Sequence, residues 1–306
     1  MRNTFIIIIL TVLLAQTGLA QIDTLKIEHI SKTTNKYDSF VILNDRLFAL
    51  NSIGQLIIWD LEKLDTINFS HNDTACIRYS AIAKDRNNMV FLGTIKGDVY
   101  RVDPSDLSYS LYYHDKYRIY SICFNSENNM FLVVPYAIYE PRTKKHWEKF
   151  ENHAGGIIVK RKKFMGLSWK QTDEYFTLPQ FTYLDSQDRW WMCASHGEFG
   201  GDVEIFDTKN KKILSNRFEG LKTGDISPQS VFESPNKNIY ITSGLQHFIN
   251  SGEIYQISTD GKSTKIFDSN DFQDTTKQGG VYGNLFIGPG AYNSQESTIY
   301  FASSEG

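Results

Sequence analysis

Two short polar loops hold the residues of this chain that are best suited to chemistry. His196 and Glu198 lie two positions apart in the segment SHGEFGG, and Gln246 and His247 are adjacent in SGLQHFINSG. An imidazole close to a carboxylate can form an acid/base pair or contribute to a metal site. The same polar groups, each loop also holding a phenylalanine, suit the binding of a small molecule or a glycan. A solvated loop between two strands is the simpler interpretation of both segments.

Recognised catalytic motifs are missing from the sequence. It contains no Gly-x-Ser-x-Gly, no His-Glu-x-x-His and no phosphate-binding loop. We therefore predict no catalytic residue, no metal and no cofactor. Three other polar groups have structural interpretations: Tyr112–His114 as packing near a junction of repeats, Lys160–Lys163 as a hairpin tip, and Asp271 with Asp274 as a flexible loop.

A repeat positions these loops. The segment Gly201–Asp207 has relatives at Gly54–Asp60, Gly97–Asp103 and Gly252–Ser258. Each begins with glycine and a polar residue, then has an aliphatic residue third and a large apolar residue sixth. These two positions point to opposite faces of a strand, so the sheet must be buried on both sides. Such a strand fits a blade stacked between two other blades.

A hairpin precedes the glycine strand in several copies. Tyr79–Gly97, Tyr120–Val134 and Val231–Gly244 each read as strand, polar turn and apolar strand. The second strands recur at the spacing of four-stranded propeller blades. They centre near Leu47, Val90, Phe131, Phe164, Trp191, Tyr240 and Tyr300. The prediction is an all-β β-propeller of about seven blades over residues 21–306, with blades near 38–66, 78–112, 118–150, 155–178, 180–217, 228–268 and 281–306.

The first 20 residues read as a signal peptide. Arg2 precedes the apolar stretch Phe5–Leu14, and Gly18–Ala20 supplies small residues for cleavage before Gln21. A single membrane anchor is the alternative, although the stretch is shorter than a spanning helix needs. No comparable stretch follows, so we expect an exported protein, periplasmic or extracellular, without a span in its mature region.

The two ends of the predicted propeller are expected to be linked. Thr24–Ile30 alternates apolar and polar residues and is the candidate closing strand. The last blade has only two strands before Gly306, which would leave an unpaired edge. We therefore expect the natural chain to continue past Gly306, and a longer chain to be more stable and less prone to aggregate.

Composition argues against nucleic acid as a partner and indicates how the cysteines are used. The net charge is −3 and there is no long basic block, so we expect no nucleic-acid contact. Cys123 and Cys193 lie in apolar strands and read as buried thiols, while Cys76 lies in a loop. A Cys76–Cys123 disulfide stays open as an alternative.

Two segments resemble the repeats of two-component regulator propellers. Ser80–Pro104 and Phe181–Asp207 are similar to the family's sequence of strand, Asp-containing turn, Trp-Ile-Gly-Thr-like strand and double glycine. Phe91–Thr94 matches the Gly-Thr strand, and Trp190-Trp191 with Gly200-Gly201 matches the Trp and the glycines. The family's turn glycine is replaced here by Asn88, Asn129 or Asp188.

The resemblance implies a periplasmic sensor without catalytic activity. In the family, the propeller usually precedes a β-sandwich, a membrane helix and a histidine kinase or DNA-binding module, so a signalling module is expected beyond Gly306. From the loop residues themselves, we expect the ligand to be a small molecule or a glycan, bound at His196, Glu198, Gln246 and His247. The alternative is an exported propeller hydrolase or lyase that acts on a small molecule or glycan.

Overall fold

A computed structural model describes most of the chain. The described residues are 6–11, 37–67, 69, 77–135, 137–147, 150–151, 157–164, 167–174, 176–214, 218–221, 225–246, 250–271 and 285–304. Within them the regular structure is strand, apart from short 3-10 segments. Short β-branched and aromatic runs between turn residues account for this, because they favour strands over helices.

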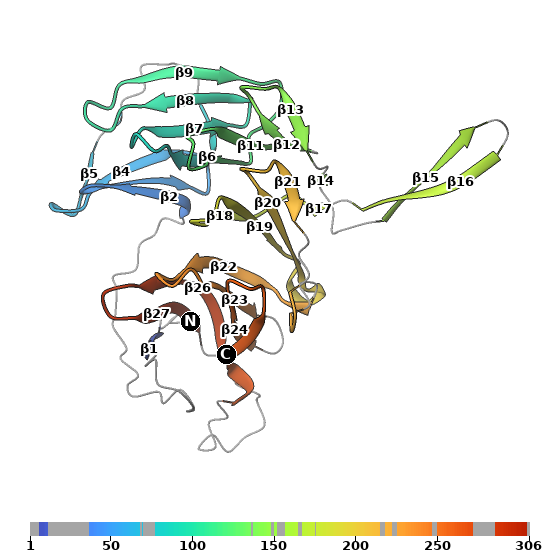
Figure 1. The fold of residues 1–306 in the computed structure, drawn as a ribbon. Helices are drawn as coiled ribbons and strands as arrows, with labels where there is room; N and C mark the ends of the chain where they lie inside the picture. The colour runs from blue at the N-terminus through green and yellow to red at the C-terminus, as the bar shows by residue number, and fades with distance from the viewer. Residues whose placement is uncertain are drawn as a thin grey trace. The chain divides into compact units, whose positions relative to one another are not determined.

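Five four-stranded antiparallel sheets form the blades of a β-propeller (Figure 1). In each sheet the strands follow chain order, so every blade is a meander. Blade one contains β2 (Tyr37–Leu43), β3 (Arg46–Asn51), β4 (Leu56–Asp60) and β5 (Asp65–Ile67); blade two contains β6 (Tyr79–Lys84), β7 (Val90–Thr94), β8 (Asp98–Val102) and β9 (Tyr109–His114). Blade three contains β10 (Ser121–Phe124), β11 (Met130–Val134), β12 (Ala137–Glu140) and β13 (Lys145–Trp147). Blade four contains β18 (Phe181–Leu184), β19 (Arg189–Ser195), β20 (Gly201–Asp207) and β21 (Lys212–Leu214); blade five contains β22 (Pro228–Glu233), β23 (Ile239–Gln246), β24 (Asn250–Ile257) and β25 (Ser263–Asp268).

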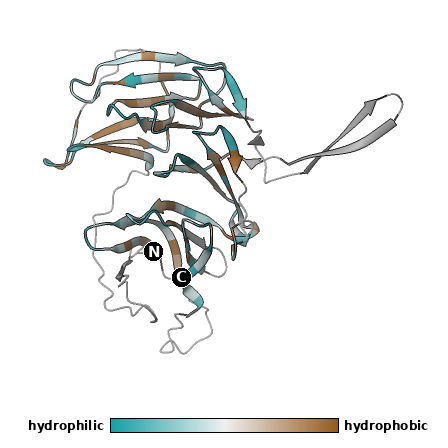
Figure 2. Cartoon of the chain, in the orientation of Figure 1, coloured by the Kyte–Doolittle hydropathy of each residue, from teal (hydrophilic) through white to brown (hydrophobic). Residues whose placement is uncertain are grey.

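Burial falls from the second strand to the fourth. Every residue of β7 and β11 is buried, whereas β9 and β13 have no buried residue. Hydrophobic residues follow the strands, and hydrophilic residues gather at the turns (Figure 2). Apolar cores are shared by neighbouring blades: Phe91 of blade two packs with Phe124 and Leu132 of blade three. Second strands buried on both faces are therefore the main hydrophobic contribution to each blade.

The first turn of several blades depends on one buried polar side chain. Asp85 Oδ1 accepts hydrogen bonds from the backbone N–H groups of Asn87 and Met89, at 2.9 and 2.8 Å. Asn125 and Asp185 accept the corresponding pairs in blades three and four. The fourth residue of each turn has positive φ: Asn88, Asn128, Asp188 and, in blade five, Lys237. Asparagine and aspartate tolerate this region. In blade three the left-handed residue is therefore Asn128, and the prediction of Asn129 is wrong.

The repeated glycine lies where two blades meet. A Cβ added to Gly54 would lie 2.6 Å from the carbonyl oxygen of Tyr79, the first residue of the next blade. A Cβ on Gly97 would lie 2.7 Å from the carbonyl oxygen of Tyr117, and one on Gly201 would lie 2.5 Å from Cδ of Pro228. Glycine is needed at these positions because main-chain atoms, or the Pro228 ring at Gly201, occupy the space of a side chain.

The described residues form five four-stranded blades, and this does not match the predicted count of about seven. The predicted blade at 155–178 contains a two-stranded hairpin, β15 (Ile157–Phe164) with β16 (Leu167–Glu174). On either side, β14 (Phe150–Glu151) and β17 (Phe176–Thr177) form a short parallel pair. The sequence of β15 explains the difference, because four consecutive cationic residues cannot supply apolar positions on both faces of a strand.

A three-stranded sheet lies at the C-terminal end of the described chain. The hairpin of β26 (Phe286–Asn293) and β27 (Thr298–Ser304) pairs through β27 with β1 (Ile6–Thr11). Six residues of the predicted signal peptide therefore form a strand here. The predicted closing strand Thr24–Ile30 lies outside the described residues.

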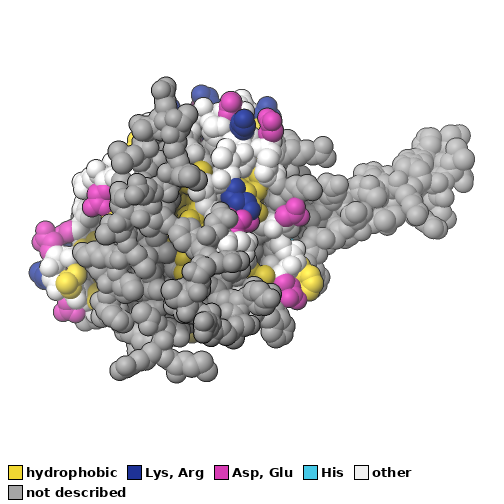
Figure 3. Space-filling model, turned by 90° about the horizontal axis from the view of Figure 1, so that it is seen from below, with side chains coloured by type: hydrophobic (Ala, Val, Ile, Leu, Met, Phe, Trp, Pro, Cys, Tyr) yellow, Lys and Arg dark blue, Asp and Glu magenta, His cyan; other side chains and the backbone are white. Residues whose placement is uncertain are grey.

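Two compact units make up the chain. One comprises residues 33–179 and 207–213, and the other comprises residues 1–32, 180–206 and 214–306. Each site discussed below lies within a single unit. Described Lys, Arg, Asp and Glu side chains are interspersed on the face drawn in Figure 3. A search of the described residues for a helix of membrane-spanning length and hydropathy finds none.

Candidate ligand-binding site

The loop between β19 and β20 is a compact turn that carries His196. Its central residues form the 3-10 segment η1 (Gly197–Phe199). The His196 N–H donates to the carbonyl oxygen of Gly200 at 2.7 Å, which closes the loop at its base. Gly197 and Gly200 have φ values of 63° and 80°, a region that glycine reaches without steric cost. The glycines of SHGEFGG thus let the chain reverse in a few residues.

His196 and Asp202 form a hydrogen-bonded pair. His196 Nε2 lies 3.0 Å from Asp202 Oδ2, and the two side chains are 16% and 33% exposed. A carboxylate in this position orients the imidazole through the hydrogen bond. The pair can anchor the loop or, for a suitable substrate, act in proton transfer.

The outer surface of the loop presents Glu198 and Phe199 to solvent. Phe199 is 80% exposed. The segment η1 lies beside β23, whose last residue, Gln246, is also exposed. The structure thus places His196, Glu198 and Gln246 on neighbouring elements of one unit, and His247 lies outside the described residues.

Hydrogen bonds among polar residues hold the start of the β19–β20 loop in place. Ser195 Oγ hydrogen-bonds Ser227 Oγ, and the Ser227 N–H donates to Ser243 Oγ at 3.0 Å. Gln180 Nε2 donates to the Ser195 carbonyl oxygen at 2.9 Å. These residues escaped the sequence analysis. The available signal was weak: a serine at or next to the end of an apolar strand, repeated in blades four and five.

Two reactive groups of blade four have raised pKa values. Burial raises the pKa of the Cys193 thiol. Burial, with smaller contributions from Glu233 and Asp185, raises the pKa of Tyr183 to about 12. A thiol or phenol with a raised pKa is a poor nucleophile. Cys123 is also buried, as expected for an apolar strand, and Cys76 lies outside the described residues.

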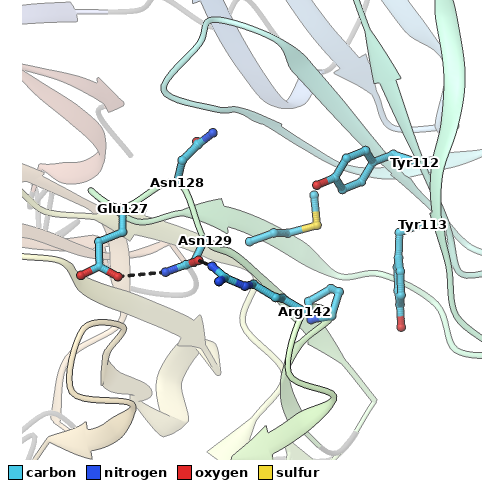
Figure 4. Close-up of a pocket in the computed structure, with 8 residues that line it drawn as sticks. Tyr112, Tyr113, Glu127, Asn128, Asn129 and Arg142 are labelled. Carbon is cyan, nitrogen blue, oxygen red and sulfur yellow. Dashed lines mark hydrogen bonds between the residues drawn. The ribbon is translucent and has the colours of Figure 1, made fainter.

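A pocket of about 490 Å³ lies in the other unit, between β9 and the turns of blade three (Figure 4). Its walls include Tyr112, Tyr113, Glu127, Asn129 and Arg142. The sequence indicated packing near a blade junction at Tyr112–His114 and gave no sign of a pocket. The missed signal was a pair of tyrosines on a strand whose neighbours are exposed.

A search of the described residues for groups of three or more His, Cys, Asp or Glu side chains able to hold a metal ion finds none. The predicted site residue His247 was not part of that search, since it lies outside them. The donors at the loop are one imidazole and carboxylates on a solvent-exposed turn.

Comparison with known proteins identifies the fold and no family. No protein-family model and no curated protein match the chain. Among solved structures, it is similar to the virginiamycin B lyase from Staphylococcus aureus, in a catalytically inactive form with quinupristin, at 9% identity and a TM-score of 0.52. That match covers 92% of this chain and 84% of the lyase. A mitotic checkpoint complex chain matches at 13% identity and a TM-score of 0.50, over 91% of this chain and 80% of that one.

A third likeness is to the extracellular domain of a hybrid two-component system protein from B. thetaiotaomicron. It has 16% identity and a TM-score of 0.49, which is too low to support an inference. It covers 85% of this chain, and the chain spans only 31% of the length of that protein. Taken with the five four-stranded sheets, the comparisons define an all-β β-propeller.

Proposed function

We propose that this chain is a non-catalytic, exported β-propeller that binds a small molecule or a glycan and acts as the sensor part of a longer signalling protein. The observation that carries the proposal is the exposed Phe199, 80% accessible, on a loop that backbone hydrogen bonds and the His196–Asp202 pair hold in place. An exposed aromatic ring beside polar groups on a supported loop is typical of ligand recognition.

The ligand would lie across the β19–β20 and β23–β24 loops. Phe199 offers an apolar face, and Glu198 and Gln246 offer hydrogen-bonding groups from the two loops. His247 would contribute from the second loop. Such a domain needs no chemical step, because a ligand that prefers one arrangement of the downstream segments shifts their equilibrium.

The test is a binding screen followed by substitution. A panel of neutral and acidic mono- and disaccharides and small metabolites is scanned by thermal shift, and hits are measured by calorimetry. Replacing His196, Glu198, Gln246 and His247 together with alanine is expected to abolish binding of a hit. A matched control replaces exposed polar residues of blade one, Asp45 and Gln55, with alanine. Unchanged affinity in the quadruple variant would refute the site.

A propeller lyase or hydrolase is the second candidate, and the His196–Asp202 pair is the observation that favours it. A carboxylate-oriented imidazole suits a general base. Under this alternative, His196→Gln would abolish turnover of a bound compound and leave its affinity within a few-fold. Under the sensor proposal, incubation returns the ligand chemically unchanged, as mass spectrometry would show.

Export is proposed from the N-terminal sequence. Cleavage before Gln21 is expected when the full chain is expressed with a working secretion system. Intact-mass measurement of the secreted protein checks this, and recovery of Met1 on exported protein would contradict it.

Downstream of Gly306 we propose a signalling module, which sequencing of the gene beyond this point would reveal.

A further inference from the structure

The pocket of blades two and three holds a line of three polar side chains. Arg142 Nη1 donates to Asn129 Oδ1 at 3.1 Å, and Asn129 Nδ2 donates to Glu127 Oε2 at 3.0 Å (Figure 4). A guanidinium can only donate and a carboxylate can only accept. The orientation of the Asn129 amide is therefore determined by its neighbours. One amide separates a positive group from a negative group.

Arg142 and Glu127 can each form further hydrogen bonds besides the one to Asn129. Arg142 has five N–H donors and Glu127 has two acceptor oxygens, while the Asn129 amide uses one site on each. Both side chains belong to exposed residues, so a ligand reaches them without displacing the core. A ligand that satisfies both must carry an anionic and a cationic group only a few bonds apart.

An apolar wall adjoins the charges. Tyr112 is 54% exposed, and its ring is supported edge-on by the buried Phe91, with ring centroids 5.1 Å apart. Met130 and Pro141 add further apolar surface to the lining. A supported ring with an open face is suited to stack on a flat or bulky apolar group.

We propose that this pocket binds a free α-amino acid with a large apolar side chain. Its carboxylate bonds the Arg142 guanidinium, its ammonium bonds the Glu127 carboxylate, and its side chain packs on Tyr112. Charge-assisted hydrogen bonds of this kind are roughly twice as strong as neutral ones. A neutral sugar would leave both charges without a counter-charge. The volume of about 490 Å³ lies in the range of small-ligand pockets.

Calorimetry of the 306-residue chain with three related ligands tests the assignment of each charge. L-phenylalanine has both groups, L-phenylalaninamide lacks the carboxylate, and 3-phenylpropionate lacks the ammonium. Arg142→Gln and Glu127→Gln are each expected to weaken L-phenylalanine binding by about tenfold or more. Arg142→Gln should not weaken the amide further, and Glu127→Gln should not weaken 3-phenylpropionate further.

Control variants separate this pocket from general effects. Tyr112→Ala is expected to weaken L-phenylalanine about tenfold, whereas Tyr117→Ala and Lys145→Gln, also at exposed positions, leave it unchanged. His196→Gln is also expected to leave L-phenylalanine binding unchanged. The test of this pocket is therefore independent of the test of the proposed sensor site. The proposal is overturned if L-phenylalanine, L-leucine and L-tryptophan give no heat at about 10 mM. Binding that Glu127→Gln and Arg142→Gln do not alter overturns it too, as does tighter binding of glucose or glucuronate in the same pocket.

Discussion

Asp185 is the residue on which the first turn of blade four depends most. It is 2% exposed. Its Oδ1 accepts from the backbone N–H groups of Gln187 and Arg189, and its Oδ2 accepts from Arg189 Nε at 2.6 Å and Trp191 Nε1 at 2.9 Å. One carboxylate thus serves the turn and satisfies the indole of a fully buried tryptophan.

Replacing Asp185 with alanine is expected to lower the free energy of unfolding by about 2–3 kcal/mol. The loss arises because Trp191 Nε1 would remain buried without its acceptor. Urea denaturation measures it. Asp207→Ala is the matched control, since Asp207 caps an exposed turn through Lys209 and Asn210. A loss at Asp185 no larger than at Asp207 would mean that the indole finds another acceptor.

Lys265 and the two carboxylates that it contacts predict that the stability of the fold depends on pH. Lys265 Nζ lies 2.5 Å from Glu253 Oε1 and 2.7 Å from Asp268 Oδ2. Burial alone would raise the pKa of Asp268, but hydrogen bonds from Lys265 and Asn270 lower it below its ordinary value of 3.8. A lowered folded pKa contributes stability that is fully present above 3.8 and is lost as the pH falls through the folded value.

Asp268→Asn is therefore expected to lower the melting temperature at neutral pH and to reduce the further drop on acidification below about pH 4. Melting curves at neutral and acidic pH measure both effects. Asp45→Asn, at an exposed turn position, serves as control. If wild type and Asp268→Asn lose the same stability on acidification, the Lys265 group has no part in the acid transition.

At the scale of elements, the glycine at the start of the third strand sets the distance to the next blade in blades one, two and four. Gly97→Ala is expected to cost at least about 2 kcal/mol, because the new Cβ meets the backbone of Asp115 and Tyr117. Gly261→Ala separates the contact from the backbone conformation. Gly261 has φ +86°, close to the +94° of Gly97, but nothing lies within 4 Å of its Cβ position. The excess loss at Gly97, measured by denaturation, reports the contact, and equal losses would remove the contact from the explanation.

Elements whose pattern is local were predictable from sequence. The glycine strands and the polar turns repeat in the sequence. The structure has the glycine strand in blades one, two, four and five, and the Asp or Asn turn in blades two, three and four. The hairpin β15–β16 was predicted to be part of a full blade. The sequence of two adjacent strands does not show whether further strands pair with them. The Tyr112 pocket was missed because its lining comes from β9, the β10–β11 turn and the β12–β13 turn. Only the packing of one blade on the next brings these segments together.

At the scale of the whole molecule, the β15–β16 hairpin is expected to be dispensable for the five blades. The two strands pair with each other in a two-stranded sheet, and such a hairpin is marginally stable alone. Replacing residues 157–174 with a Gly-Ser linker is expected to shift the melting temperature by only a few degrees. Circular dichroism follows the transition. Replacing residues 56–67, which removes β4 and β5, should abolish it; a loss of the transition with the hairpin replacement would instead make the hairpin part of the folded core.

The glycine joints have a consequence for how such a chain can change over time. The fit between blades at these points needs a missing side chain on one blade and only main chain or a proline ring on the other at Gly54, Gly97 and Gly201. No matched pair of side chains has to be preserved at these three joints, whereas a Cβ on Gly252 would meet the side chain of Ile287. A duplicated blade would therefore fit beside an unrelated copy as well as beside its parent. Side chains around these joints are then free to diverge, which fits repeats that share a glycine, a polar turn and an apolar pattern.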